Sequence, residues 1–210
     1  MLTLDVGCSG VTAPSDAAVP ILRFHLEVRE SGETPVRILA LRCQIRVEPG
    51  RRHHAEAAEA TLQELFGAGD RWRDNLHPMP FASQDVVVGD FTGHTDLSLD
   101  VPVTYDFEVT SARYFRALED GEVPFLLLFS GSAFAIHDGH LQVTPVSWAT
   151  ECRVRMPIAV WQQAVDTFYP ATTFLRVHRD TLSDLEVVRR ERCLPGWDAT
   201  LQSLLESVRR

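Results

Sequence analysis

The sequence contains no lysine, and all twenty of its basic residues are arginine. This absence excludes a catalytic lysine that forms a Schiff base and the lysine of a phosphate-binding P-loop. The chain has 29 acidic residues and a net charge of −9, which opposes general binding to nucleic acid or to an anionic membrane surface. No apolar run approaches the roughly 18 residues of a transmembrane helix. We therefore expect a cytoplasmic protein that neither inserts into a membrane nor binds nucleic acid.

Closely spaced metal-binding cysteines are also lacking. The four cysteines lie far apart and none forms a C-x-x-C motif: Cys8, Cys43, Cys152 and Cys193. Cys43 and Cys152 fall on the apolar faces of predicted strands, where buried thiols are common. The chain has no G-x-G-x-x-G motif, no P-loop, and no haem or iron–sulfur ligand spacing. The sequence therefore predicts no cofactor.

What is present is enough apolar sequence for a sizeable core. The 210 residues are 45% hydrophobic, so neither a metal nor a disulfide is needed for stability. We predict a single domain over residues 1–210, with a β-sandwich core over about 1–156 and a C-terminal helical portion over about 157–210.

Strict alternation of apolar and polar side chains predicts the first long strands. Residues 22–28 and 39–47 alternate in this way, and Ser31-Gly32-Glu33 between them predicts a hairpin turn. Two antiparallel strands with one solvent-exposed face are typical of a sandwich. The predicted fold class is α+β, mainly β: an antiparallel β-sandwich of roughly seven to nine strands with short inserted helices.

The stretch from Leu97 to Ile136 organises the predicted fold. It reads as a strand over 97–109, a helix over 111–118 and a strand over 123–136 that is apolar on both faces near Phe125. Asp138-Gly139 predicts a hairpin that leads into a further strand. Beyond Pro145, the side chains predicted to point inward are Val146, Trp148, Cys152, Val154 and Met156.

Earlier in the chain, apolar residues at helical spacing predict a helix over 54–66. Residues 67–83, which contain Pro78 and Pro80, predict an irregular connector.

The segment from Arg51 to Glu59 is a candidate metal or anion site. On a helix start, His53 and Glu56 could share one face, and His54 with Glu59 is a second candidate pair. Zinc normally takes a third protein ligand, which the neighbouring sequence does not supply, and the adjacent arginines oppose a cation. A solvated helix N-terminus explains the same residues and is the favoured interpretation.

Other polar groups allow chemistry but have simpler explanations. The histidines of His137-Asp138-Gly139-His140 flank a turn, and Ser130-Gly131-Ser132 lacks the G-x-S-x-G elbow of a hydrolase. Small residues in a strand let another element approach closely. One strand face carries four carboxylates that fit general acid–base work, calcium binding or plain solvation: Asp96, Asp100, Asp106 and Glu108.

Two segments favour protein binding. Trp72, flanked by Arg71 and Arg73, has the composition of an interaction hot spot, although a Trp that anchors the connector to the core is the alternative. Trp197 and Leu201 belong to an apolar stripe on the last predicted helix, which fits either internal packing or a partner.

A family resemblance follows from an ordered set of short motifs. The set begins with Arg71-Trp72 and ends with Trp148, Pro157 and Trp161. Between them come Phe91-Thr92-Gly93, Pro102-Val103-Thr104-Tyr105-Asp106, Tyr114-Phe115 with Leu118, Gly121-Glu122-Val123-Pro124 and Leu128-Phe129-Ser130-Gly131. From about Leu22 to Leu205 the chain resembles a bacterial family with a domain of unknown function, common in actinobacteria and often encoded near uptake [NiFe]-hydrogenase genes. The resemblance implies an accessory or assembly role in hydrogenase biology and supplies no catalytic residues.

The sequence thus favours a non-enzymatic accessory protein that binds a protein partner, and the resemblance implies that this partner is related to a hydrogenase. Two alternatives stay open: a small-ligand-binding protein or metal-dependent enzyme that uses the His53/His54 region, and a structural subunit of a larger complex. A homo-oligomer also stays open.

Overall fold

The computed structural model describes residues 3–32, 34–54, 58, 62–63, 65–67, 76–103, 110–137, 139–172 and 177–209. The chain forms two compact units, Met1–Thr172 and Thr173–Arg210. They are described separately, and one domain over residues 1–210 stays a prediction. No helix among the described residues is long and apolar enough to span a membrane.

The first unit holds all the described strands. In chain order its elements are β1 (Leu4–Thr12), β2 (Ile21–Glu30), β3 (Val36–Val47), the 3-10 helix η1 (Pro49–Arg51), β4 (Met79–Val88), β5 (His94–Pro102), α3 (Ser111–Arg116), β6 (Glu122–His137), β7 (His140–Pro145), β8 (Glu151–Pro157) and α4 (Ile158–Phe168). The second unit contains α5 (Arg179–Glu191) and α6 (Trp197–Val208).

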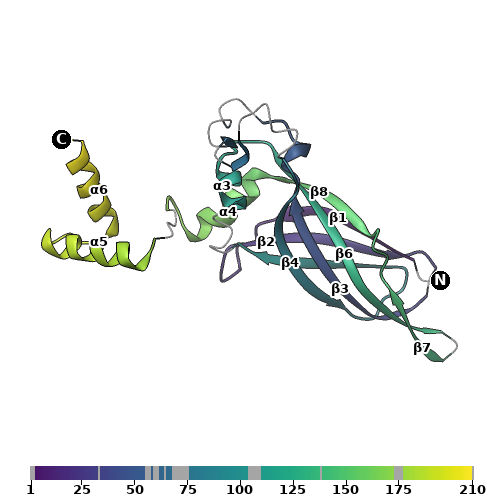
Figure 1. The fold of residues 1–210 in the computed structure, drawn as a ribbon. Coiled ribbons are helices and arrows are strands. Elements are labelled where there is room, and N and C mark those ends of the chain that lie inside the picture. Colours follow the sequence, from purple (N-terminus) through teal and green to yellow (C-terminus); the bar gives the residue numbers. More distant parts are fainter. Residues whose placement is uncertain are drawn as a thin grey trace. The chain divides into compact units, whose positions relative to one another are not determined.

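The strands form two packed sheets, which confirms the predicted sandwich. One sheet has the order β1-β2-β5, and the other has the order β4-β3-β6-β7, with β8 paired to the same edge of β6 as β7. Every strand pair in the described residues is antiparallel. Figure 1 shows α3 and α4 at one end of the sandwich and the β6–β7 hairpin at the other.

An aromatic cluster at the helical end joins the two sheets. The Phe125 ring on β6 lies 5.5 Å from that of Phe24 on β2 and 5.2 Å from that of Phe81 on β4, centroid to centroid. Phe115 on α3 contacts Phe125 at 6.2 Å and Trp161 on α4 at 5.5 Å. Edge-to-face aromatic packing of this kind adds to the burial of apolar area, so the inserted helices complete the core.

The predicted 97–136 stretch is largely confirmed. The α3 helix and β6 fall where the periodicity puts them, and Phe125 and Leu127 on β6 are fully buried. The preceding strand ends at Pro102, and residues 104–109 lie outside the described residues. Within the predicted 54–66 helix, the described residues 58, 62–63 and 65–66 are helical.

The predicted hairpin at Ser31-Gly32-Glu33 is wrong, because β2 and β3 lie in different sheets. The buried Glu30 carboxylate accepts hydrogen bonds from the backbone N–H groups of Gly32 (2.9 Å) and Thr34 (2.8 Å). These bonds stabilise a turn that carries the chain across the sandwich. Turn residues serve an arch between sheets as well as a hairpin, so the local sequence does not distinguish the two.

Two further predictions need correction. The connector over residues 67–83 ends earlier than predicted, since β4 begins at Met79 and includes Pro80. Proline is tolerated there because β4 is an edge strand. Trp148, predicted to point inward, is 91% exposed because it precedes β8 and lies in a turn.

Candidate protein-interaction surface

Several residues singled out in the sequence lie outside the described residues. They are Glu56, Glu59, Arg71, Trp72 and Arg73. A partner-binding role for the Arg-Trp-Arg segment stays a prediction.

His53 and His54 follow the η1 helix and are not themselves helical. The guanidinium of the neighbouring Arg52 donates hydrogen bonds to the backbone oxygens of Asp120 (3.1 Å) and Glu122 (3.2 Å). Arg52 therefore ties this segment to the turn between α3 and β6. The resulting surface hollow is lined by Arg51, Arg52, His53, Asp120, Gly121, Glu122 and Arg155, and its three arginines outnumber its two carboxylates, which disfavours a metal cation.

The two histidines have different surroundings. His53 is exposed, whereas the His54 ring Nε2 lies 3.1 Å from the hydroxyl of the fully buried Tyr114. Burial, reinforced by the nearby Arg52, lowers the pKa of His54 to about 4, and burial raises the pKa of Tyr114. The His54 imidazole is thus neutral at neutral pH and hydrogen-bonded to the core.

Among the described residues, no group of three His, Cys, Asp or Glu side chains is arranged to hold a metal ion. The buried carboxylate nearby, Glu48, is paired with Arg51 (3.1 Å) and Arg153 (3.2 Å). These ion pairs compensate the cost of burying its charge.

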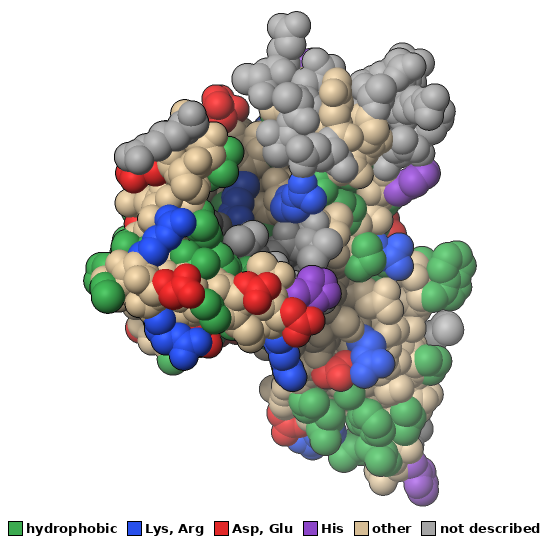
Figure 2. Space-filling view, turned by 60° about the vertical axis from the view of Figure 1, so that its left-hand side comes forward, with side chains coloured by type: hydrophobic (Ala, Val, Ile, Leu, Met, Phe, Trp, Pro, Cys, Tyr) green, Lys and Arg blue, Asp and Glu red, His purple; other side chains and the backbone are tan. Residues whose placement is uncertain are grey.

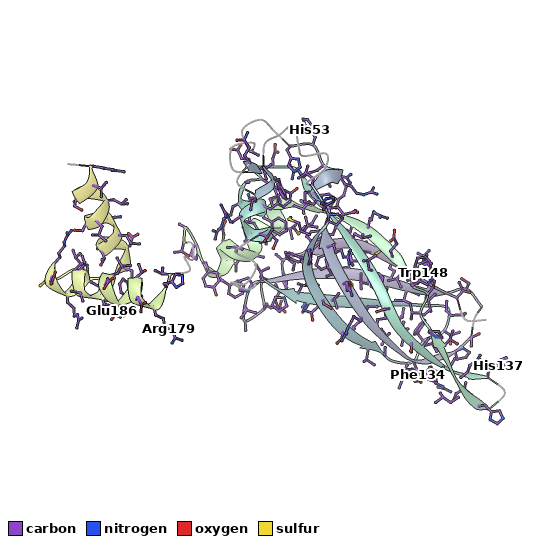
Figure 3. The ribbon with its side chains drawn as sticks, viewed as in Figure 1. His53, Phe134, His137, Trp148, Arg179 and Glu186 are labelled. Carbon is purple, nitrogen blue, oxygen red and sulfur yellow. The ribbon has the colours of Figure 1, made fainter. Side chains whose placement is uncertain are left out.

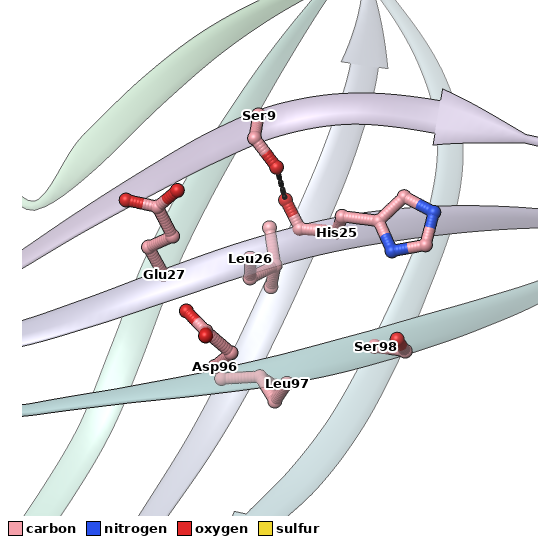
Figure 4. Close-up of a pocket in the computed structure, with 7 residues that line it drawn as sticks. All are labelled: Ser9, His25, Leu26, Glu27, Asp96, Leu97 and Ser98. Atoms are coloured by element: carbon pink, nitrogen blue, oxygen red, sulfur yellow. Dashed lines mark hydrogen bonds between the residues drawn. The ribbon is translucent and has the colours of Figure 1, made fainter.

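A shallow hollow on the outer face of the three-stranded sheet is lined by seven residues: Ser9, His25, Leu26, Glu27, Asp96, Leu97 and Ser98 (Figure 4). The His25 ring contacts the Thr12 hydroxyl at 2.9 Å, whereas Ser9 donates to the His25 backbone oxygen. Glu27 pairs with Arg29 at 3.1 Å. A nucleophile–base pair requires a serine hydroxyl hydrogen-bonded to an imidazole. In this hollow the His25 ring and Glu27 bond to other neighbours, and neither serine is hydrogen-bonded to the imidazole.

The acidic strand face and the Ser-Gly-Ser segment have structural roles. Asp100 forms a two-bond ion pair with Arg23 on β2, at 2.6 and 2.8 Å. Gly131 has a φ of +145°, and a Cβ on it would clash with the Ala40 backbone oxygen. The close approach of β3 to β6 thus requires glycine, as small residues in a strand indicate.

Trp148 occupies a turn whose two ends are hydrogen-bonded to β6. The Val146 N–H donates to the Gly131 oxygen (2.9 Å), and the Phe129 N–H donates to the Thr150 oxygen (3.0 Å). Within the turn, the Thr150 N–H donates to the Ser147 backbone oxygen (3.0 Å). A tryptophan that is 91% exposed on such a supported turn presents a large apolar area with little loss of backbone entropy on binding.

Apolar side chains also gather on the outer face of the five-stranded sheet. Directly paired residues share a face, so Ile38, Phe134 and Val143 form one row across β3, β6 and β7, and Ile136 and Leu141 form the next. Together with Val87 on β4 they make the hairpin patch: Ile38, Val87, Phe134, Ile136, Leu141 and Val143. All are exposed except Phe134, which is half-buried.

The hairpin patch has a clear boundary. Toward the helical end the same sheet face becomes polar, with Arg42 and Asp85 in a two-bond ion pair at 2.7 and 2.9 Å. Figure 2 shows hydrophobic side chains gathered at the lower end of the molecule, and Figure 3 labels Phe134 and His137 there, with His53 at the opposite end. A contiguous exposed apolar patch of this kind is a mark of interaction sites.

The sequence did not reveal the hairpin patch. The available signal was the presence of apolar residues at strand positions whose side chains point to solvent. Which of these residues lie side by side depends on strand pairing. Ile38 and Leu141 lie about a hundred residues apart in the chain and come together only through the β3–β6–β7 register.

The second unit carries Trp197 and Leu201 on one face of α6. The Arg189 guanidinium on α5 lies 4.6 Å from the Trp197 ring centroid, a cation–π contact. Trp197 is 38% exposed and Leu201 40%. Trp197 therefore supports the α5–α6 pair and still presents apolar surface.

A family model for proteins of unknown function matches residues 1–210. The chain belongs to the DUF6084 family. The family description assigns no activity, and no curated protein matches this DUF6084 chain significantly.

Similar solved structures include a β-glucosidase from Kluyveromyces marxianus, with 7% identity and a TM-score of 0.28 over 74% of this chain and 15% of that chain. A CARDB domain from Pyrococcus furiosus gives 8% identity and a TM-score of 0.29 over 74% of this chain and 86% of that chain. β-Glucosidase 3B from Thermotoga neapolitana gives 12% identity and a TM-score of 0.27 over 73% and 17%. The chain thus spans less than a fifth of these β-glucosidases, and TM-scores this low carry no conclusion about its activity.

Proposed function

We propose that this DUF6084 protein is a non-enzymatic interaction protein that binds a protein partner through exposed apolar side chains. The observation that carries the proposal is the exposure of Trp148 on a turn hydrogen-bonded to β6, together with the hairpin patch on the neighbouring sheet face. Tryptophan concentrates at interface hot spots, since one rigid side chain covers a large area.

The polar candidate sites support the same conclusion. Asp100 is in an ion pair with Arg23, Asp96 lies 3.3 Å from the His94 ring, and His54 is hydrogen-bonded to Tyr114 in the core. The available apolar surface is thus the stronger feature of the described chain. The helix pair α5–α6 offers a second contact surface through Trp197 and Leu201.

The partner we propose is a component or assembly factor of a [NiFe]-hydrogenase or a related redox complex. This part of the proposal rests on the family resemblance, which implies an accessory role near such enzymes.

A quantitative pulldown from a host that makes a [NiFe]-hydrogenase tests both parts. The tagged wild-type chain should recover hydrogenase subunits or their assembly factors. Trp148→Ala should reduce recovery by about 10-fold or more, as expected for a hot-spot tryptophan worth about 2 kcal/mol. The matched control is Val19→Ala, which truncates a side chain that is 47% exposed elsewhere in the first unit and should leave recovery unchanged.

Parallel variants identify which surface binds. Phe134→Ala tests the hairpin patch, Leu201→Ala tests the α5–α6 pair and Trp72→Ala tests the Arg-Trp-Arg segment. Unchanged recovery in Trp148→Ala and all three variants, with folding intact, would contradict binding through these side chains. A defined complex that lacks any hydrogenase component would contradict the hydrogenase part alone.

A further inference from the structure

The β7 strand is an exposed sheet edge. Among the described residues it pairs with β6 alone, and five of its six residues are exposed. An unpaired strand edge is a template for another strand unless charge, proline or a bulge blocks it.

The other outer strands carry such blocks. Asp5 and a register shift interrupt β1, Pro80 and Asp85 lie in β4, and Asp96 and Asp100 lie in β5. The β8 strand alternates charges, with Glu151, Arg153 and Arg155. In contrast, β7 has the sequence His-Leu-Gln-Val-Thr-Pro, without Asp, Glu or Arg.

The direction of the β7 backbone groups follows from its register. His137 pairs with His140 across the two-residue turn, and such a turn is closed by a hydrogen-bonded pair. Hydrogen-bonded pairs then alternate, and the bond from the Val146 N–H to the Gly131 oxygen continues the series. The N–H and C=O groups of Leu141 and Val143 therefore point away from β6, to the open edge.

We propose that β7 pairs with β7 of a second copy of this chain in an antiparallel, two-fold symmetric dimer. Leu141 of each copy lies opposite Val143 of the other, so that these two residues donate and accept all the bonds of the new pair. Pro145, which has no N–H, falls outside this bonded set. The five-stranded sheets of the two copies then become one continuous sheet.

The chemistry of the edge fits a second copy. A two-fold pairing places each side chain opposite one from the same strand, and like charges opposite each other destabilise such a pair. A strand without Asp, Glu or Arg avoids this repulsion, and β7 is such a strand although the chain as a whole carries −9. Because the dyad is perpendicular to the sheet, both hairpin patches lie on one face, where they form a larger apolar surface.

Disulfide trapping tests this register. In a Cys193→Ser background, which removes the exposed native thiol, Gln142→Cys puts one thiol opposite its symmetry mate. Cα atoms of a directly opposed, non-hydrogen-bonded pair are about 4.5 Å apart, within disulfide reach. Thr144→Cys is the matched control, because its symmetry mate is about four residues away along the strands, roughly 13 Å. Under mild oxidation Gln142→Cys should form covalent dimer at least about 10-fold faster than Thr144→Cys.

Sedimentation equilibrium of the full chain provides the second measurement. The wild type should be a dimer, and Val143→Pro, which removes one outward N–H without removing a bond to β6, should be monomeric. Leu141→Asp, which places two like charges diagonally across the new strand pair without changing the backbone, should also be monomeric. Val87→Ala on β4 should remain dimeric.

A wild-type chain that stays monomeric at high concentration would overturn the proposal, leaving the edge to a strand of another protein. A dimer that persists in both β7 variants, or equal cross-linking at positions 142 and 144, would place the interface elsewhere and also overturn it. All measurements use the purified chain alone, so their failure is distinct from failure of the pulldown.

Discussion

The His54–Tyr114 contact makes the stability of the first unit depend on pH. The pKa of His54 is lowered from 6.5 to about 4, chiefly by burial of the imidazole. Between these values the unfolded chain binds a proton that the folded chain does not, so the free energy of unfolding decreases as the pH falls. The contribution is complete above about pH 6.5 and is lost progressively toward about pH 4.

The magnitude follows from proton linkage. At about pH 5 the shift corresponds to about 2 kcal/mol relative to about pH 7.5. The imidazole is only half-buried, so solvent screening reduces the expected loss to about 1 kcal/mol.

Urea unfolding followed by tryptophan fluorescence at about pH 7.5 and about pH 5 measures this loss. His54→Gln keeps a side chain able to hydrogen-bond Tyr114 but cannot titrate, so it should show a pH dependence smaller by about 1 kcal/mol. His53→Gln, which changes the exposed neighbour, should keep the wild-type dependence. If His54→Gln and the wild type lose stability equally, the burial argument is wrong.

Three further predictions concern the core. Phe125→Ala should lower the free energy of unfolding by about 3–5 kcal/mol in urea titration, since the ring joins both sheets; a loss below about 1 kcal/mol would contradict its central role. Gly131→Ala should cost about 3 kcal/mol or more because its Cβ meets the β3 backbone, whereas Gly10→Ala, whose Cβ meets nothing within 4 Å, should cost much less. In the native protein a thiol reagent should modify exposed Cys193 fast and Cys43 only on unfolding, since burial raises the pKa of Cys43 to about 12; fast labelling of Cys43 itself, located by peptide mapping, would contradict this.

Much of the local structure was predictable from the sequence. The alternation in residues 22–28 and 39–47 reports which side chains are buried, because side-chain direction in a strand has a fixed period of two. The Asp138-Gly139 hairpin is confirmed by the His137–His140 pairing, although Asp138 itself lies outside the described residues. The α3 helix was equally evident from its periodicity.

The failures share a physical cause. A turn at Ser31-Gly32 looks the same whether the chain pairs with itself or crosses to the other sheet, and the pairing of β2 and β3 with strands of different sheets decides the outcome. Trp148 was predicted to point inward because it shares the alternating phase of Val146, Cys152, Val154 and Met156, whereas a turn interrupts that alternation and the backbone bonds to β6 hold the turn outside the sandwich. A period of two reports side-chain direction only where the strand continues.

The candidate interaction surface also combines features that the sequence determines with features that depend on the tertiary structure. The sequence by itself determined that the chain has a large antiparallel β core, no lysine chemistry and no close-spaced cysteine ligands, since these depend on composition and local period. Only the tertiary structure decided that Ile38, Phe134 and Val143 form one apolar row and that β7 is an open sheet edge. Strand order and register are set by contacts between distant segments, and no local pattern encodes which strand remains unpaired.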